Sequence, residues 1–240
     1  MAQPEIPPIE QILTGLGETH CASLDLGGMY TRNPTAHKWK APYRSWELRE
    51  SVYWRTHDLL TQSYALHQMG HGLGARILLR SAFETLAMLI YLNQRIGKVL
   101  AGTLDYHAFS TNIEQSVLGS RDGSTPVTAV NILNVLDNCD KRYKGIQKLY
   151  DRLSESAHPN YEGMSAGYTT IDRQADVVHF SNRWMEGYGA AHVDLMMECV
   201  GIFRDEYNDV WPELFEKLEK WIEANDEMLE ATKAAPVTTA

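Results

Sequence analysis

The chain has 240 residues, 44% of them hydrophobic and 22% charged, which is enough apolar material for one large core. It has no run of 18 apolar residues, and its first residues lack the basic and apolar regions of a signal peptide, so we expect a cytoplasmic protein without a membrane anchor. The net charge of −9 disfavours a general nucleic-acid-binding surface. However, 11 acidic and 4 basic residues lie after position 197, which leaves residues 1–197 near neutrality at −2.

Residues 1–44 are rich in proline and glycine and show little periodicity, so they predict an extended N-terminal arm and not a helix. Ser45 suits a helix N-cap, and after it apolar residues recur at spacings of three and four up to the glycines at 70–74. This pattern predicts a first long helix. The segment 75–97 is apolar almost all round, which is typical of a helix at the centre of a bundle.

Further helices are expected over residues 104–118, over about 127–143, and in a short stretch that Pro159 closes. Two β-prone runs within residues 164–181 flank a DRQA turn and predict a small β-hairpin. A long helix is expected from about 189 to 230, with Pro212 marking a kink or a break, before a disordered tail over 231–240. The sequence therefore predicts an all-α helical bundle, a single domain over 45–230, with a β-hairpin insertion and a long C-terminal helix.

The C-terminal helix carries an apolar stripe at spacings typical of a coiled coil, formed by Trp211, Leu214, Leu218, Trp221 and Met228. The stripe has two explanations. It folds back on its own bundle, or it pairs with a second copy across a two-fold axis, where identical stripes are self-complementary. We favour the second and predict a homodimer.

Three motifs imitate known sites, and each lacks a necessary part. The glycine-rich GHGLG, residues 70–74, follows a helix and not the strand that a phosphate-binding loop requires. His67 and His71 have the spacing of a metal-binding pair, without the glutamate of the metalloprotease motif or an evident third ligand. Glu155 and His158 match one half of a di-iron site that needs two such pairs. We therefore expect neither a metal nor a cofactor.

Arg80 and Glu84 are charged residues four apart on the most apolar helix, where an unpaired charge would cost several kcal/mol. They must therefore pair with something. One explanation is an internal salt bridge that fixes how the helices pack. The other is that one of them orients a group in a cleft, for which Arg152 and His158 are the candidates.

Arg152 and His158 have a chemical rationale as a pair. An arginine presents a planar fork that binds phosphate oxygens, and a neutral histidine can accept a proton from a sugar hydroxyl near pH 7. On an ideal helix the two would lie on opposite sides of the apolar stripe formed by Ile146, Tyr150 and Leu153. Because His158 precedes a proline, its backbone is biased out of the helical region, and a distortion there could bring the two side chains together. A second protomer could also complete the site.

Two segments resemble the HEPN superfamily of all-α domains. These are an R-S-x-x-E helix, LLRSAFETLAMLIYL, and a later Y-x-x-L-S-x-x-x-H-P segment, YDRLSESAHP, in the same order along the chain. The resemblance covers roughly residues 45–210 and points to a poorly characterised bacterial branch. It implies a dimer in which Arg152 and His158 line a cleft. We expect Arg80, Glu84, Tyr150 and Ser154 as supporting residues.

Catalytic members of this superfamily are metal-independent ribonucleases of toxin–antitoxin, abortive-infection and CRISPR systems, so the resemblance implies this activity. Active members usually place Asn or Asp after the arginine, whereas this chain has Leu153. Other members are non-catalytic modules that bind a nucleotide or a partner protein such as an antitoxin. Both functions remain hypotheses at this point.

A basic, aromatic stretch at the end of the predicted arm could contact RNA through Lys38, Trp39, Lys40, Tyr43 and Arg44. Its aromatic rings could stack on bases. They could equally tie the arm to the bundle, which is the role that we favour.

Overall fold

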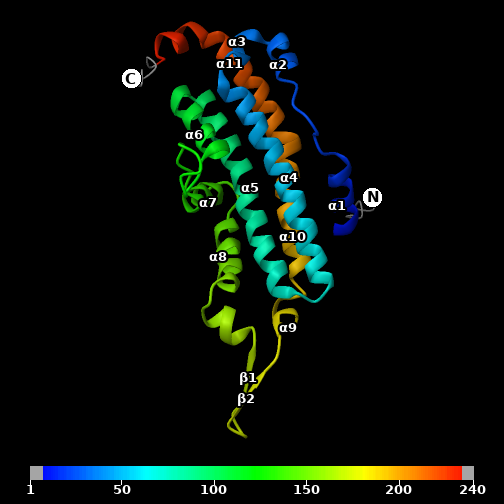
Figure 1. Ribbon diagram of the computed structural model, residues 1–240. Helices are drawn as coiled ribbons and strands as arrows, with labels where there is room; N and C mark the ends of the chain where they lie inside the picture. The colour runs from blue at the N-terminus through cyan, green and yellow to red at the C-terminus, as the bar shows by residue number, and fades with distance from the viewer. Residues whose placement is uncertain (1–7, 234–240) are drawn as a thin grey trace. The chain divides into compact units, whose positions relative to one another are not determined.

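The computed structural model describes residues 8–233 and shows an all-α protein with one two-stranded antiparallel sheet, as the sequence predicts (Figure 1). Its first half contains the helices α1 (Ile9–Glu18), α2 (Leu26–Arg32), α3 (Pro34–His37), α4 (Lys40–Gln68), α5 (Gly72–Leu100) and α6 (Tyr106–Leu118). Its second half contains α7 (Ile132–Asp140), α8 (Ile146–Ala157), the π-helix η1 (Tyr161–Ala166), β1 (Thr169–Asp172), β2 (Val177–Phe180), α9 (Trp184–Tyr188), α10 (His192–Arg204), the π-helix η2 (Asp205–Val210) and α11 (Trp211–Ala231).

The chain divides into two compact units, each built from three separate stretches. Unit 1 contains the residues up to His20, Val52–Ala87 and Ile132–Phe203, and unit 2 contains Cys21–Ser51, Met88–Asn131 and the residues from Arg204 onward. Both α4 and α5 therefore contribute residues to both units. The prediction of a single domain over 45–230 stays a prediction.

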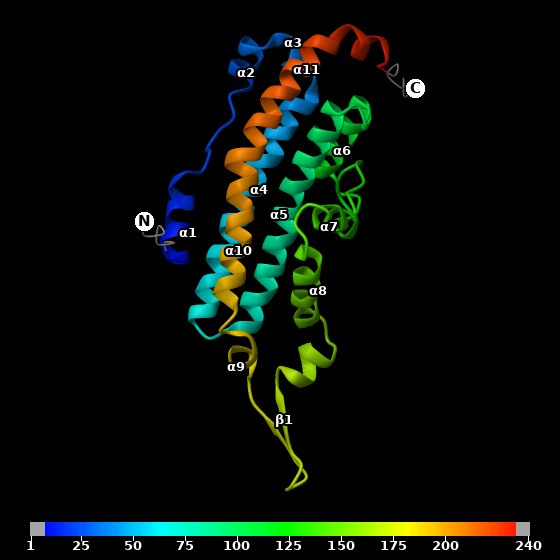
Figure 2. The ribbon, with the colours of Figure 1, turned by 180° about the vertical axis from the view of Figure 1, so that it is seen from behind.

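The core of unit 1 forms around the first half of α5. In both ribbon views α5 runs beside α4 and α10 (Figures 1 and 2). Small and large apolar side chains alternate on α5, which lets neighbouring helices approach closely and interdigitate. The fully buried residues on this part of α5 are Ala75, Leu79, Ala82, Phe83, Leu86 and Ala87. The short helix α8, which hydrogen bonds join to α5, buries a stripe formed by Ile146, Tyr150 and Leu153.

The prediction that the N-terminal arm is extended is wrong, because residues 9–37 contain three helices and α4 begins at Lys40. Pro34, one of the prolines that argued against a helix, occupies a position that tolerates it. Pro34 lies in the first turn of α3, where its missing N–H has no helical acceptor, and Asn33 caps that helix through a bond from Ala36 N–H. Ser45 does not cap α4. It lies inside the helix and donates to the Ala41 carbonyl.

Two other predicted boundaries differ from the structure. The helix expected at about 127 begins at Ile132, because the preceding residues form a bridge in which Ser120 pairs with Thr128. The break expected at Pro212 lies upstream, in the π-helical turns of η2, where Trp211 N–H bonds the Glu206 carbonyl five residues back. Pro212 itself fits the first turn of α11. Of the predicted tail, Ala231 ends α11, and residues 234–240 lie outside the described residues.

The apolar stripe of α11 is partly buried inside unit 2, where Leu214 and Trp221 are half-buried and Met228 is 45% exposed. Trp211 and Leu218 are buried, and the same face buries Phe215, Ile222 and Leu229. Trp211 stacks on Phe215 with 4.5 Å between ring centroids. The structure thus favours the fold-back explanation for this stripe. The predicted homodimer stays a prediction.

Among the helices between residues 8 and 233, none combines the length and the apolar composition required to cross a lipid bilayer.

Candidate functional site

Arg152 and His158 lie at the C-terminal end of α8, and both are exposed. The helix ends at Ala157, and His158 has an extended backbone, with φ −97° and ψ 148°, as its position before Pro159 predicts. The His158 ring and the Arg152 guanidinium make no hydrogen bond or ion pair to any part of the chain that the structure describes. The structure does not bring the two side chains into contact with each other. Both are available to an external ligand.

Arg76 on α5 holds the backbone beneath this pair. Its side chain is 5% exposed, and it donates from Nε to Ser156 Oγ at 2.7 Å and from Nη2 to the Arg152 carbonyl at 3.2 Å. Glu162 on η1 accepts from Ser156 Oγ at 2.6 Å and lies 3.5 Å from Arg76 Nη2. The Tyr188 ring covers the guanidinium, with 4.1 Å from Cζ to the ring centroid. We call Arg76, Ser156, Glu162 and Tyr188 the Arg76 network.

Burial lowers the pKa of Arg76, and the charge of Glu162 opposes this shift. The nearby positive charge of Arg152 lowers the pKa of Arg76 further. The two guanidinium groups are therefore close enough for their charges to interact at this end of α8.

Arg80 forms a second network one turn further along α5. It donates from Nε to Ser154 Oγ at 2.8 Å and from Nη2 to the Tyr150 hydroxyl, and it pairs with Glu84 at 3.1 Å. The Tyr150 hydroxyl donates to Glu84 Oε1 at 3.0 Å. Burial raises the pKa of Tyr150, so the hydroxyl keeps the proton that it donates. These four residues, all predicted as supporting residues, thus meet in one hydrogen-bonded cluster that joins α5 to α8.

The link between α8 and η1 requires a glycine at one position. A Cβ on Gly163 would lie 2.0 Å from the His158 carbonyl oxygen, so no other residue fits without a shift of the backbone. Asn160 holds the same turn from the other side, because its side-chain oxygen accepts from Gly163 N–H at 3.0 Å. The position of His158 therefore depends on tight packing of the backbone around it.

The stretch predicted to contact RNA is largely engaged within unit 2. Trp39 is buried and donates from Nε1 to Asp226 at 2.9 Å, and Lys38 pairs with Asp226 at 2.7 Å and with Glu230 at 3.0 Å. Arg44 is buried and pairs with Glu114 at 2.8 Å. These contacts support the packing role. Lys40 is exposed and Tyr43 is half-buried.

His67 and His71 do not come together as a metal-binding pair. His67 donates from Nε2 to the Gly189 carbonyl at 3.0 Å and stacks on His192, whereas His71 is exposed. Between residues 8 and 233, no group of three or more His, Cys, Asp or Glu side chains is placed to hold a metal ion. Glu155, the partner of His158 in the half di-iron motif, accepts a bond from Asn160 instead.

His192 is a buried titratable group that the sequence reading did not single out. The Ser63 hydroxyl donates its one hydrogen to the Ala75 carbonyl at 2.8 Å, so it must accept from His192 Nε2, at 3.0 Å. Burial lowers the pKa of His192 to about 4, and the charges of His67 and Arg76 act in the same direction. His192 is therefore neutral at pH 7.

This shift predicts that the protein loses stability in acid. Between pH 6.5 and about 4 the unfolded chain binds a proton at His192 that the folded chain does not, so the free energy of unfolding falls as the pH falls through this window. At about 1.4 kcal/mol per pH unit, the loss is on the order of 3 kcal/mol. In urea unfolding between pH 7 and 4, His192→Gln should flatten this dependence, and the exposed control His71→Gln should not. Equal pH dependence in the two variants would contradict the assignment.

Comparison of the chain with protein-family models, curated proteins and solved structures gives no match.

Proposed function

We propose that the chain is a HEPN-like domain that cleaves single-stranded RNA without a metal ion, in a bacterial defence or toxin–antitoxin system. His158 is the general base and Arg152 binds the phosphate. The observation that carries the proposal is the exposure of both side chains, free of intrachain hydrogen bonds and ion pairs within residues 8–233, at a helix end that the Arg76 network holds.

In this reaction His158 takes the proton of a ribose 2′-hydroxyl, and the 2′-oxygen attacks the adjacent phosphorus. Arg152 stabilises the additional negative charge on the phosphoryl oxygens through two parallel N–H bonds. The bond from phosphorus to the 5′-oxygen of the next nucleotide breaks, and that oxygen takes a proton from water or from His158. The products are a 2′,3′-cyclic phosphate and a 5′-hydroxyl.

A non-catalytic module that binds a partner protein or a nucleotide is the second candidate, and one observation favours it. Leu153, where active members of the superfamily usually carry a polar residue, is 1% exposed and part of the buried face of α8. Ser154, Ser156 and Glu162, three polar side chains at this end of the helix, are already bonded within the chain. A site that keeps Arg152 and His158 but lacks this polar residue would bind an anionic ligand and not cleave it.

One assay tests the proposal and separates the candidates. Purified full-length protein should cut 5′-labelled single-stranded RNA in the presence of EDTA and leave 2′,3′-cyclic phosphate ends. The same oligonucleotide with 2′-deoxy sugars should stay intact, because it lacks the nucleophile. An Arg152→Ala, His158→Ala double variant serves as the control for contaminating ribonuclease. Wild-type protein no more active than this variant would reject the enzyme and leave the binding module.

A further inference from the structure

The β-hairpin has one apolar face that nothing in unit 1 covers. Its register pairs Thr169 with Phe180 and Ile171 with Val178, so these four side chains share a face. The opposite face carries Thr170, Asp172, Val177 and His179. On the first face Ile171 is 67% exposed, Val178 47% and Phe180 79%. We call Ile171, Val178 and Phe180 the hairpin face.

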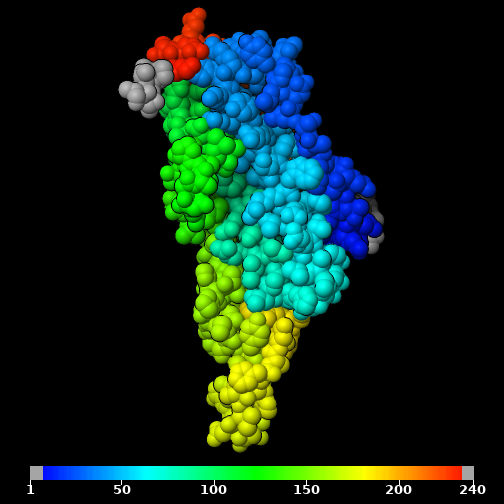
Figure 3. Space-filling model, viewed as in Figure 1, coloured from blue at the N-terminus to red at the C-terminus, as the bar shows by residue number. Residues whose placement is uncertain are grey.

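The hairpin extends beyond the helices of its own unit, and no other part of that unit covers it on the side that Figure 3 shows. A hydrogen bond holds the first strand at the base of the hairpin, since Arg183 donates from Nη1 to the Thr169 carbonyl at 2.9 Å. A two-stranded hairpin with both faces in water is at best marginally stable. Three adjoining apolar side chains on such an element are typical of an interaction surface.

We propose that the hairpin face packs against the hairpin face of a second copy of this chain, across a two-fold axis. This proposal is independent of the ribonuclease activity. It also gives the predicted homodimer an interface other than the stripe of α11, of which unit 2 buries Trp211 and Leu218.

Charge favours a second copy over other occupants. The hairpin face has no charged side chain, so two copies can meet without placing like charges opposite each other. Asp172 lies on the other face and is used in the turn, where its carboxylate accepts from Gln174 N–H and Ala175 N–H. Residues 169–180 contain one arginine and two aspartates, so they offer no basic patch to an anionic lipid surface or to nucleic acid.

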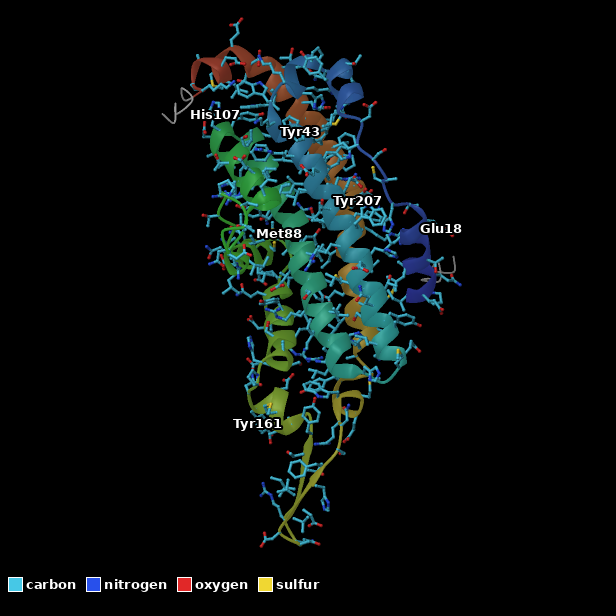
Figure 4. All side chains as sticks on the ribbon, in the orientation of Figure 1. Glu18, Tyr43, Met88, His107, Tyr161 and Tyr207 are labelled. Atoms are coloured by element: carbon cyan, nitrogen blue, oxygen red, sulfur yellow. The ribbon has the colours of Figure 1, made fainter. Side chains whose placement is uncertain are left out.

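The exposed area is also suited to weak self-association. Two more exposed apolar side chains lie on η1, which leads into β1: Tyr161 at 79%, labelled in Figure 4, and Met164 at 61%. An aromatic side chain buries about 150–250 Å², so the hairpin face with part of η1 offers on the order of 500 Å² per copy. Two copies would then bury about 1,000 Å², the lower limit for a specific interface. A second copy supplies this area by symmetry, whereas another partner would need a matching apolar surface of its own.

Sedimentation velocity of the full-length protein from about 1 to 200 μM tests the proposal. We expect a concentration-dependent monomer–dimer equilibrium. An Ile171→Ser, Phe180→Ser variant should raise the dimer dissociation constant by at least tenfold, because large apolar residues at the centre of an interface carry most of its energy. Met69→Ser is the matched control, since Met69 is 68% exposed on unit 1 outside the hairpin, and it should leave the constant unchanged.

Circular dichroism establishes that the variants keep the helical content of the wild type, and a cross-link locates the interface. In a Cys21→Ser background, Val178→Cys should form an intermolecular disulfide under mild oxidation, because a face that packs on itself brings the two residues 178 together. A wild-type protein that stays monomeric at 200 μM would overturn the proposal. So would a dimer that persists in the double variant, or a monomer that floats with neutral phosphatidylcholine vesicles through this face.

Discussion

Replacement of His158 by alanine should slow RNA cleavage in EDTA by about 10²–10⁴-fold, the usual contribution of a general base. Binding of a 2′-deoxy RNA analogue should change little, because the imidazole acts on a proton that this analogue lacks. His158→Gln should be as slow as His158→Ala, since the amide has a similar size but cannot accept the proton. Initial rates with a single-site RNA substrate measure the effect, and His71→Ala, an exposed histidine on the same unit, is the control.

Arg152 provides the second half of this test. Arg152→Lys keeps the charge and loses the planar fork, so it should retain part of the activity that Arg152→Ala loses. Arg121→Ala removes an exposed arginine elsewhere and should have no effect. If the histidine and arginine variants cleave as fast as these controls, the activity belongs to another site.

Replacement of Arg76 by methionine should lower the free energy of unfolding by about 3 kcal/mol. Methionine fills much of the space but leaves the Ser156 hydroxyl and the Arg152 carbonyl without this donor, and the Glu162 carboxylate without its positive partner. Breaking a buried pair costs more than the pair contributes, because one charge stays behind. Urea unfolding at pH 7 measures the change.

The matched control for Arg76 lies one turn away. Arg80 also joins α5 to α8, but its side chain is 22% exposed, so Arg80→Met should cost only about 1 kcal/mol. Adding Glu162→Gln to Arg76→Met should restore part of the loss, since it removes the unpaired carboxylate. A smaller loss for Arg76→Met than for Arg80→Met would show that the Arg76 network does not hold α8.

The sequence predicts the long helices well because their evidence is periodic. The apolar spacing after Ser45 and the almost continuous apolar run of α5 extend over many turns, so a few exceptions do not hide the pattern. The N-terminal helices are short, and Pro34 reads as a helix breaker unless it is known to lie in a first turn. The π-helical turns of η1 and η2 have no periodicity of their own and could not be predicted.

The candidate site was partly predictable for a physical reason. Arg80 and Glu84 lie among apolar residues and had to find partners, and those partners came from the segment that carries Arg152. Arg76 was missed, although it precedes Arg80 by four residues and so lies on the same side of the same helix. Its contact with Glu162 could not be foreseen, because it depends on how the chain turns after Pro159.

The interleaving of the two units limits how this gene can be divided. The shortest fragment that keeps all of unit 1 ends at Phe203. It still carries two of the three stretches of unit 2, but it lacks the third, which contains α11. The apolar residues that α11 buries would then face solvent and make the fragment prone to aggregation. A fragment that begins at Cys21 keeps unit 2 and removes only α1 from unit 1. Neither unit can therefore be exchanged by recombination as one continuous segment.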